Sequence, residues 1–184
     1  MTDNTPVSPV SHFVTVSKLP GKGLMVKAEA DAQQRANLAR AHGLHRVEHF
    51  AYDLHLSPWK GRGVRIRGDV GAVVVQPCTV TLEPVRTEID EAIETVFVPD
   101  DSRLARPQIV EGELIVSPDG DDVPETFSHG RIDIGALAEE FFELAIPLYP
   151  RAEGAQLPDD LDNAATDNAD PQNPFAVLSA LKPH

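Results

Sequence analysis

The chain has 184 residues, of which 41% are hydrophobic and 5% aromatic. This length suffices for one domain of ordinary size with appendages and is too short for two full domains. The 16 basic and 29 acidic side chains give a formal net charge of −13, which excludes a generally basic nucleic-acid coat protein.

The charge is distributed unevenly along the chain. Residues 1–92 contain 11 basic and 10 acidic side chains, whereas residues 93–184 contain 5 and 19. An anionic partner is therefore expected to meet the first half. The sequence has no apolar run approaching 18 residues and no signal pattern at its start, and its one cysteine, Cys78, excludes an internal disulfide. We therefore expect a soluble, cytoplasmic protein with no membrane partner.

Short elements are expected in the first part of the chain. Residues 1–10 are predicted to form a flexible lead and residues 13–19 a short strand, which a Pro-Gly turn ends. A helix is predicted over residues 31–42, because Asp31 can cap its first N–H groups and Gly43 favours a left-handed stop.

From Val47 onwards the apolar pattern has a period of two, which predicts a strand with Val47 on one face and Phe50 on the other. After a turn over residues 57–61, a second strand is predicted over residues 64–74. A third is preferred over residues 85–98, where a four-residue apolar spacing also fits a helix.

Residues 76–84, between the second and third strands, contain two prolines, Pro77 and Pro84. Because proline cannot donate to a central β-ladder, this segment is predicted to be a tight connection between two long antiparallel strands.

The second half is expected to contain a short strand around residues 114–116 and a better helix over residues 134–146. Asp133 is its expected N-cap and Pro147 its stop. Its predicted apolar side consists of Leu137, Ala138, Phe141, Leu144 and Ala145.

These elements predict an α+β fold, an antiparallel β-sheet of about four to six strands with a long hairpin and one covering helix. A short C-terminal helix follows on an acidic linker, because residues 151–172 contain six acids and one base. The expected organisation is a lead (1–10), a single domain (11–150), the linker (151–172) and the C-terminal helix (173–184).

One basic run is a candidate RNA-binding surface. Its cations lie on a turn and the start of a strand, and the two-residue period places Arg65 and Arg67 on one face. A phosphate backbone could lie along them while an aromatic ring stacks on a base. The alternative is a solvated strand face that balances the acidic half. The candidate residues are Trp59, Lys60, Arg62, Arg65 and Arg67.

A Cys78-dependent enzyme or a histidine metal site is a further alternative, for which the sequence supplies little support. A nucleophilic cysteine needs a base, and nothing in the sequence places a histidine beside Cys78. The histidines between His42 and His55 lack a cysteine or a clear carboxylate partner. The sequence thus predicts no enzyme activity, no cofactor and no metal.

Four stretches, residues 76–84, 130–140, 147–151 and 173–178, resemble in this order the blocks of the YceD family, the large ribosomal RNA subunit accumulation proteins. The resemblance extends over about residues 10–182. The signature residues in this chain are Cys78, Thr81, Leu82, Glu83, Pro84 and Asp133.

The resemblance implies a role in the accumulation of large-subunit (23S) ribosomal RNA and in ribosome biogenesis. Many members have a second cysteine three places after the first, where this chain has Thr81, so a zinc-binding pair is not expected. We expect a factor that contacts ribosomal RNA or a pre-ribosomal particle. The alternative is an acidic adaptor that binds basic ribosomal or assembly proteins without touching RNA.

Overall fold

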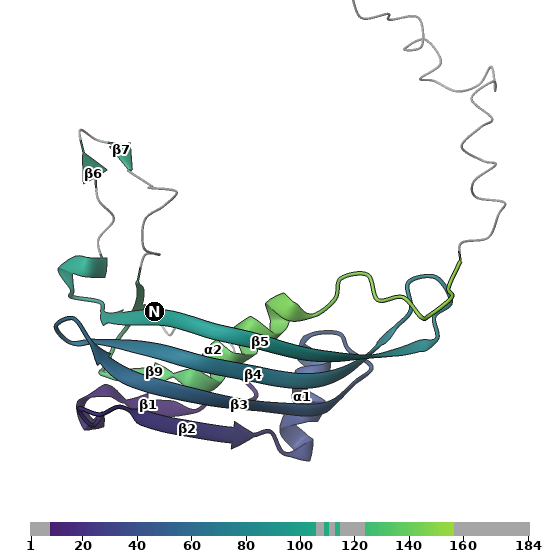
Figure 1. Ribbon diagram of the computed structural model, residues 1–184, viewed down its shortest axis with the longest axis horizontal. Coiled ribbons are helices and arrows are strands. Elements are labelled where there is room, and N and C mark those ends of the chain that lie inside the picture. The colour runs from purple at the N-terminus through teal and green to yellow at the C-terminus, as the bar shows by residue number, and fades with distance from the viewer. Residues whose placement is uncertain (1–7, 106–108, 111–112, 115–123, 157–184) are drawn as a thin grey trace, which may run out of the picture.

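The computed structural model describes residues 8–105, 109–110, 113–114 and 124–156. A five-stranded sheet with the order β2–β3–β4–β5–β8 forms its centre (Figure 1). Neighbouring strands are antiparallel, except that β5 and β8 are parallel. The bounds are Leu24–Glu29 for β2, Arg46–Trp59 for β3, Gly63–Pro77 for β4, Pro84–Pro99 for β5 and Glu125–Phe127 for β8.

Two small antiparallel pairs, two helices and two 3-10 turns complete the described fold. No helix in the described ranges is long and apolar enough to cross a membrane. Most of the predicted lead and linker and all of the predicted C-terminal helix lie outside the described residues. The paired strands are β1 (Phe13–Thr15) with β9 (Arg131–Asp133) and β6 (Ile109–Val110) with β7 (Glu113–Leu114); the helices are α1 (Ala32–Ala41) and α2 (Ile134–Ala145); the 3-10 turns are Val16–Lys18 and Arg103–Ala105.

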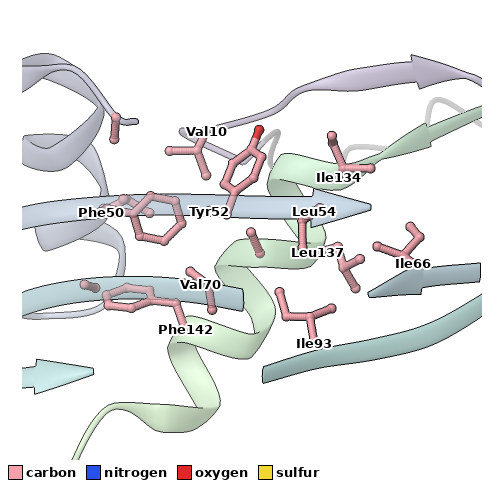
Figure 2. Close-up of a cluster of buried hydrophobic side chains, with 14 of the residues drawn as sticks. Val10, Phe50, Tyr52, Leu54, Ile66, Val70, Ile93, Ile134, Leu137 and Phe142 are labelled. Atoms are coloured by element: carbon pink, nitrogen blue, oxygen red, sulfur yellow. The ribbon is translucent and has the colours of Figure 1, made fainter. Parts of the chain in front are cut away.

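The hydrophobic core lies between one face of the sheet and α2 (Figure 2). Alternate residues of β3 and β4 face this helix, and the rings of Phe50 and Phe142 meet edge to face with centroids 5.4 Å apart. Burying each such side chain contributes about 1.5–3 kcal/mol. The opposite face of the sheet, called the open face below, is covered by no described helix.

The structure confirms the α+β class, the long hairpin and the covering helix. Asp31 caps α1 in a reciprocal capping box with Gln34, and Asp133 caps α2 by accepting the N–H of Ala136. The third predicted strand is β5, and Pro77 and Pro84 close its ladder with β4 as partners. The helical alternative for this segment is excluded.

Some local elements differ from the expectations. The strand expected over residues 13–19 ends at Thr15 and continues as a 3-10 turn. The sequence pattern did not predict β2, a short edge strand between a glycine turn and α1. The turn expected over residues 57–61 comes later, because β3 continues to Trp59 and pairs with Gly63.

Two expectations about buried faces also need correction. A β-bulge between Val47 and His49 shifts the register, so Val47 is buried on the same side as Phe50. In α2 the buried stripe passes through Phe142 and leaves Leu144 79% exposed.

Candidate functional site

The β3–β4 turn carries the predicted RNA-binding residues, called the basic turn: Trp59, Lys60, Arg62, Arg65 and Arg67. Strand alternation places Trp59, Arg65 and Arg67 on the open face, as predicted for the two arginines. The Lys60 ammonium lies 4.9 Å from the centroid of the Trp59 ring. An aromatic ring and three cations therefore lie together at this edge.

Two arginines of the basic turn are bound to carboxylates. Arg62 donates to both oxygens of Asp101 at 2.6 and 2.7 Å, and Arg67 donates to Glu94 from Nε at 2.8 Å. The hydrogen bonds between Arg62 and Asp101 raise the pKa of Arg62 and lower that of Asp101. Both pairs are exposed, so each is expected to stabilise by about 0–1 kcal/mol. Lys60 and Arg65 form no ion pair among the described residues.

Arg62 lines a cleft of about 630 Å³, which none of the other four basic-turn residues lines. Inward-facing Pro58 and Val64 line it together with Phe127 and His129. Arg62 is therefore directed to the cleft side of the sheet, and the structure does not gather all five predicted residues on one surface.

The opposite end of β4 leads into the β4–β5 turn, called the hairpin tip (residues 78–83). Backbone hydrogen bonds close it, from Cys78 N to the carbonyl of Glu83 at 2.7 Å and from Leu82 N to the carbonyl of Cys78 at 3.0 Å. Leu82 has a φ of 62°, a conformation that costs a non-glycine residue about 1–2 kcal/mol. The predicted tight connection is confirmed, but the left-handed leucine was not foreseen.

Cys78 is fully buried and accepts three backbone N–H groups at its sulfur. They come from Val80 and Thr81 at 3.4 Å and from Ala152 at 3.3 Å. These hydrogen bonds, that of Ala152 first, lower the pKa of Cys78 to about 6 because they stabilise the thiolate. Cys78 thus links the hairpin tip to the chain that follows α2.

Further hydrogen bonds fasten residues 147–152 to the same end of the sheet. Gln76 Nε2 donates to the carbonyl of Pro147 at 3.1 Å, and Thr79 donates to the carbonyl of Pro150 from its amide at 2.9 Å and its hydroxyl at 3.2 Å. Figure 1 shows this yellow-green segment passing the tip. The signature cysteine is therefore part of a structural clamp.

Ionisation of Cys78 should make stability depend on pH. Its folded pKa of about 6 lies below the ordinary value of 9.0, so the folded state binds fewer protons between these values. The contribution of Cys78 is therefore fully present above pH 9 and is lost as the pH falls through 6. Unfolding by urea between pH 6 and 9 should show this rise in wild type and a flatter profile in Cys78→Ser. Parallel profiles would contradict a stabilised thiolate.

Asp133, another signature residue, joins the N-terminal segment to the first turn of α2. Its carboxylate accepts the N–H of Ala136 at 3.1 Å, the N–H of His12 at 2.8 Å and the hydroxyl of Ser11 at 2.6 Å. The N-terminal segment is thereby fixed to the start of α2. The sequence predicted the helix cap but not these two contacts across more than 100 residues.

No group of three potential metal ligands, histidines included, occurs in the described ranges. His42 pairs with Glu139 at 2.9 Å and joins the end of α1 to α2. Burial raises the pKa of Glu139, but hydrogen bonds from His42 and Ser8 outweigh it and keep the pKa below its ordinary value.

Exposed apolar side chains near the hairpin tip were not predicted from the sequence. Leu82 is 76% exposed, Leu148 84% and Tyr149 78%, and these three residues are called the tip patch. Leu148 and Tyr149 lie between Pro147 and Pro150. These two flanking prolines were the feature of the sequence that could have indicated an exposed apolar segment after the helix.

The family model "Large ribosomal RNA subunit accumulation protein YceD" matches residues 66–182, more than half of the chain. The chain belongs to the YceD family. This confirms the resemblance, although the match begins at residue 66 rather than near residue 10. It includes the hairpin tip, Asp133 and the tip patch of this YceD-family protein, but of the basic turn it includes only Arg67. No curated protein and no solved structure matches the chain significantly.

Proposed function

We propose that this YceD-family protein is a non-enzymatic, cytoplasmic factor that supports the accumulation of large-subunit (23S) ribosomal RNA by contacting that RNA or a pre-ribosomal particle. The family description supports the role in ribosomal RNA accumulation. The contact itself is assigned to the basic turn. Its main support is that Lys60 lies over the Trp59 ring, that Arg65 shares the open face with Trp59, and that neither cation has an acidic partner in the described part of the chain.

RNA binding at this edge can gain more free energy than the loss of the existing exposed ion pair costs. The exposed pair of Arg67 with Glu94 is worth about 0–1 kcal/mol, so a phosphate can replace the carboxylate at little cost. Stacking of a base on an aromatic side chain contributes about 1–3 kcal/mol. A single-stranded segment can therefore use the indole of Trp59 and the neighbouring cations together.

Reversing the two unpaired charges should weaken RNA binding and reduce its salt dependence. For Lys60→Glu/Arg65→Glu, we expect the slope of log affinity against log salt to fall by about 0.7 for each lost phosphate contact to single-stranded RNA. The measurement is titration of a 23S ribosomal RNA fragment at several salt concentrations. Arg40→Glu/Arg46→Glu, exposed and charge-matched, is the control. Equal slopes in the two variants would contradict the assignment.

A second candidate function is that of an adaptor for basic ribosomal or assembly proteins. The excess of carboxylates in residues 93–184 favours it, since acidic surfaces steer basic partners. Pull-downs with and without ribonuclease distinguish the two functions, because only an adaptor keeps its partners after the RNA is digested.

A further inference from the structure

The tip patch contains three of the four most exposed large apolar side chains in the described structure, and hydrogen bonds of Thr79 with Pro150 and of Ala152 with Cys78 bring its two segments together. The four large apolar side chains with the greatest exposure are its three residues and Leu144, in the last turn of α2. The others, Phe13, Met25 and Leu104, are 46–55% exposed and lie on separate elements. A concentration of exposed apolar side chains at one end of a molecule is typical of a protein interaction site.

The backbone holds this patch in place from both sides. Leu82 keeps a left-handed conformation that directs a large apolar side chain into solvent. Leu148 and Tyr149 lie between two carbonyls, of Pro147 and Pro150, that accept hydrogen bonds from β4 and the hairpin tip. Such preorganisation lowers the entropic cost of binding. Nothing in the fold requires these side chains to be apolar, since they contribute little to the core.

The charged side chains around the tip patch indicate what kind of partner it would bind. Glu83, Glu143 and Glu153 are exposed beside it, with Arg151 as the neighbouring cation. The described residues 139–156 contain four carboxylates and one cation. This surface repels nucleic acid and attracts a protein segment that is basic.

We propose that the tip patch docks a basic protein segment through an apolar anchor, the partner being a protein of the large ribosomal subunit. The proposal rests on the role in ribosomal RNA accumulation but not on RNA contact by the basic turn. The whole tip patch lies within the family match over residues 66–182, whereas most of the basic turn does not.

The test compares two double variants of the full chain. Leu82→Asn/Tyr149→Ser removes apolar surface from the patch, and asparagine tolerates the left-handed backbone at residue 82. Met25→Ser/Leu104→Ser removes exposed apolar surface elsewhere. RNA-free proteins extracted from purified large subunits are passed over immobilised wild type, the retained protein is identified and purified, and its affinity is measured directly.

We expect Leu82→Asn/Tyr149→Ser to weaken this affinity at least tenfold, with the control pair within twofold of wild type and all thermal midpoints unchanged. Higher salt should weaken binding further. The proposal is overturned if no purified large-subunit protein binds, if both pairs lose affinity equally, or if a peptide of residues 173–184 or a second copy of the chain occupies the patch instead. RNA titration of the same variants separates the two proposals: tip variants should keep RNA binding, and Lys60→Glu/Arg65→Glu should keep protein binding.

Discussion

Replacing Gly135 with alanine should destabilise the protein by about 3.5–5 kcal/mol. A Cβ at this position would lie 1.8 Å from the carbonyl oxygen of Val10 and 2.8 Å from the amide nitrogen of His12. The N-terminal segment would have to move away from α2. That movement would break three hydrogen bonds, each worth about 1 kcal/mol, from Ser11 and His12 to Asp133 and from Ile134 to His12.

Two further effects oppose each other at this site. Val10 is 5% exposed, and removing it from the core costs about 1.5–3 kcal/mol, whereas alanine improves helix propensity over glycine by about 1 kcal/mol. The loss outweighs the gain. Thermal unfolding followed by circular dichroism should show a midpoint about 10 °C lower. Gly21→Ala, where a Cβ meets nothing within 4 Å, should leave the midpoint unchanged. An unchanged Gly135→Ala midpoint would show that the N-terminal segment can shift freely.

Local patterns predicted most of the sheet and both described helices. Alternation of apolar and polar residues located β3 and β4, and Asp31 and Asp133 marked the helix starts because capping is a contact within four residues. The errors came from features that depend on distant segments. The bulge that turns Val47 inward and the rotation of α2 towards Phe142 are set by packing across the sheet, which a single segment does not encode.

The same distinction applies to the candidate sites. The sequence correctly placed Arg65 and Arg67 on one face, since that follows from the strand period. It did not foresee that Arg62 binds Asp101, 39 residues away, or that the backbone of Ala152 reaches Cys78. It also placed Leu144 in the core, because periodicity locates an apolar stripe but not the angle at which the helix lies on the sheet.

The two proposed surfaces lie at opposite ends of one strand. β4 runs from Gly63 at the basic turn to Pro77 at the hairpin tip (Figure 1). At about 3.3 Å for each residue, its 15 residues span about 45–50 Å. Two partners of opposite charge can therefore bind without touching each other. A factor built in this way would hold a basic ribosomal protein near the RNA on which it assembles.

Replacing Gly68 with alanine should disrupt this strand at its middle, at a cost of about 3 kcal/mol or more. Gly68 has a φ of 154° and pairs with Leu54 of β3 and Ile93 of β5. A Cβ would lie 1.9 Å from the carbonyl oxygen of Asp53, a backbone atom that moves only if the two strands separate.

The matched control for this substitution lies three residues further along β4. At Gly71 the φ is not in the left-handed region, and a Cβ would meet only the carbonyl oxygen of Ile89, at 3.9 Å. Gly71→Ala should therefore keep wild-type stability in urea, while Gly68→Ala should unfold at a clearly lower concentration and lose binding at both ends of the strand. If the two variants unfold at the same urea concentration, the close approach of β3 at Gly68 does not constrain the sheet. The rigid spacing between the basic turn and the hairpin tip would then lose its structural basis.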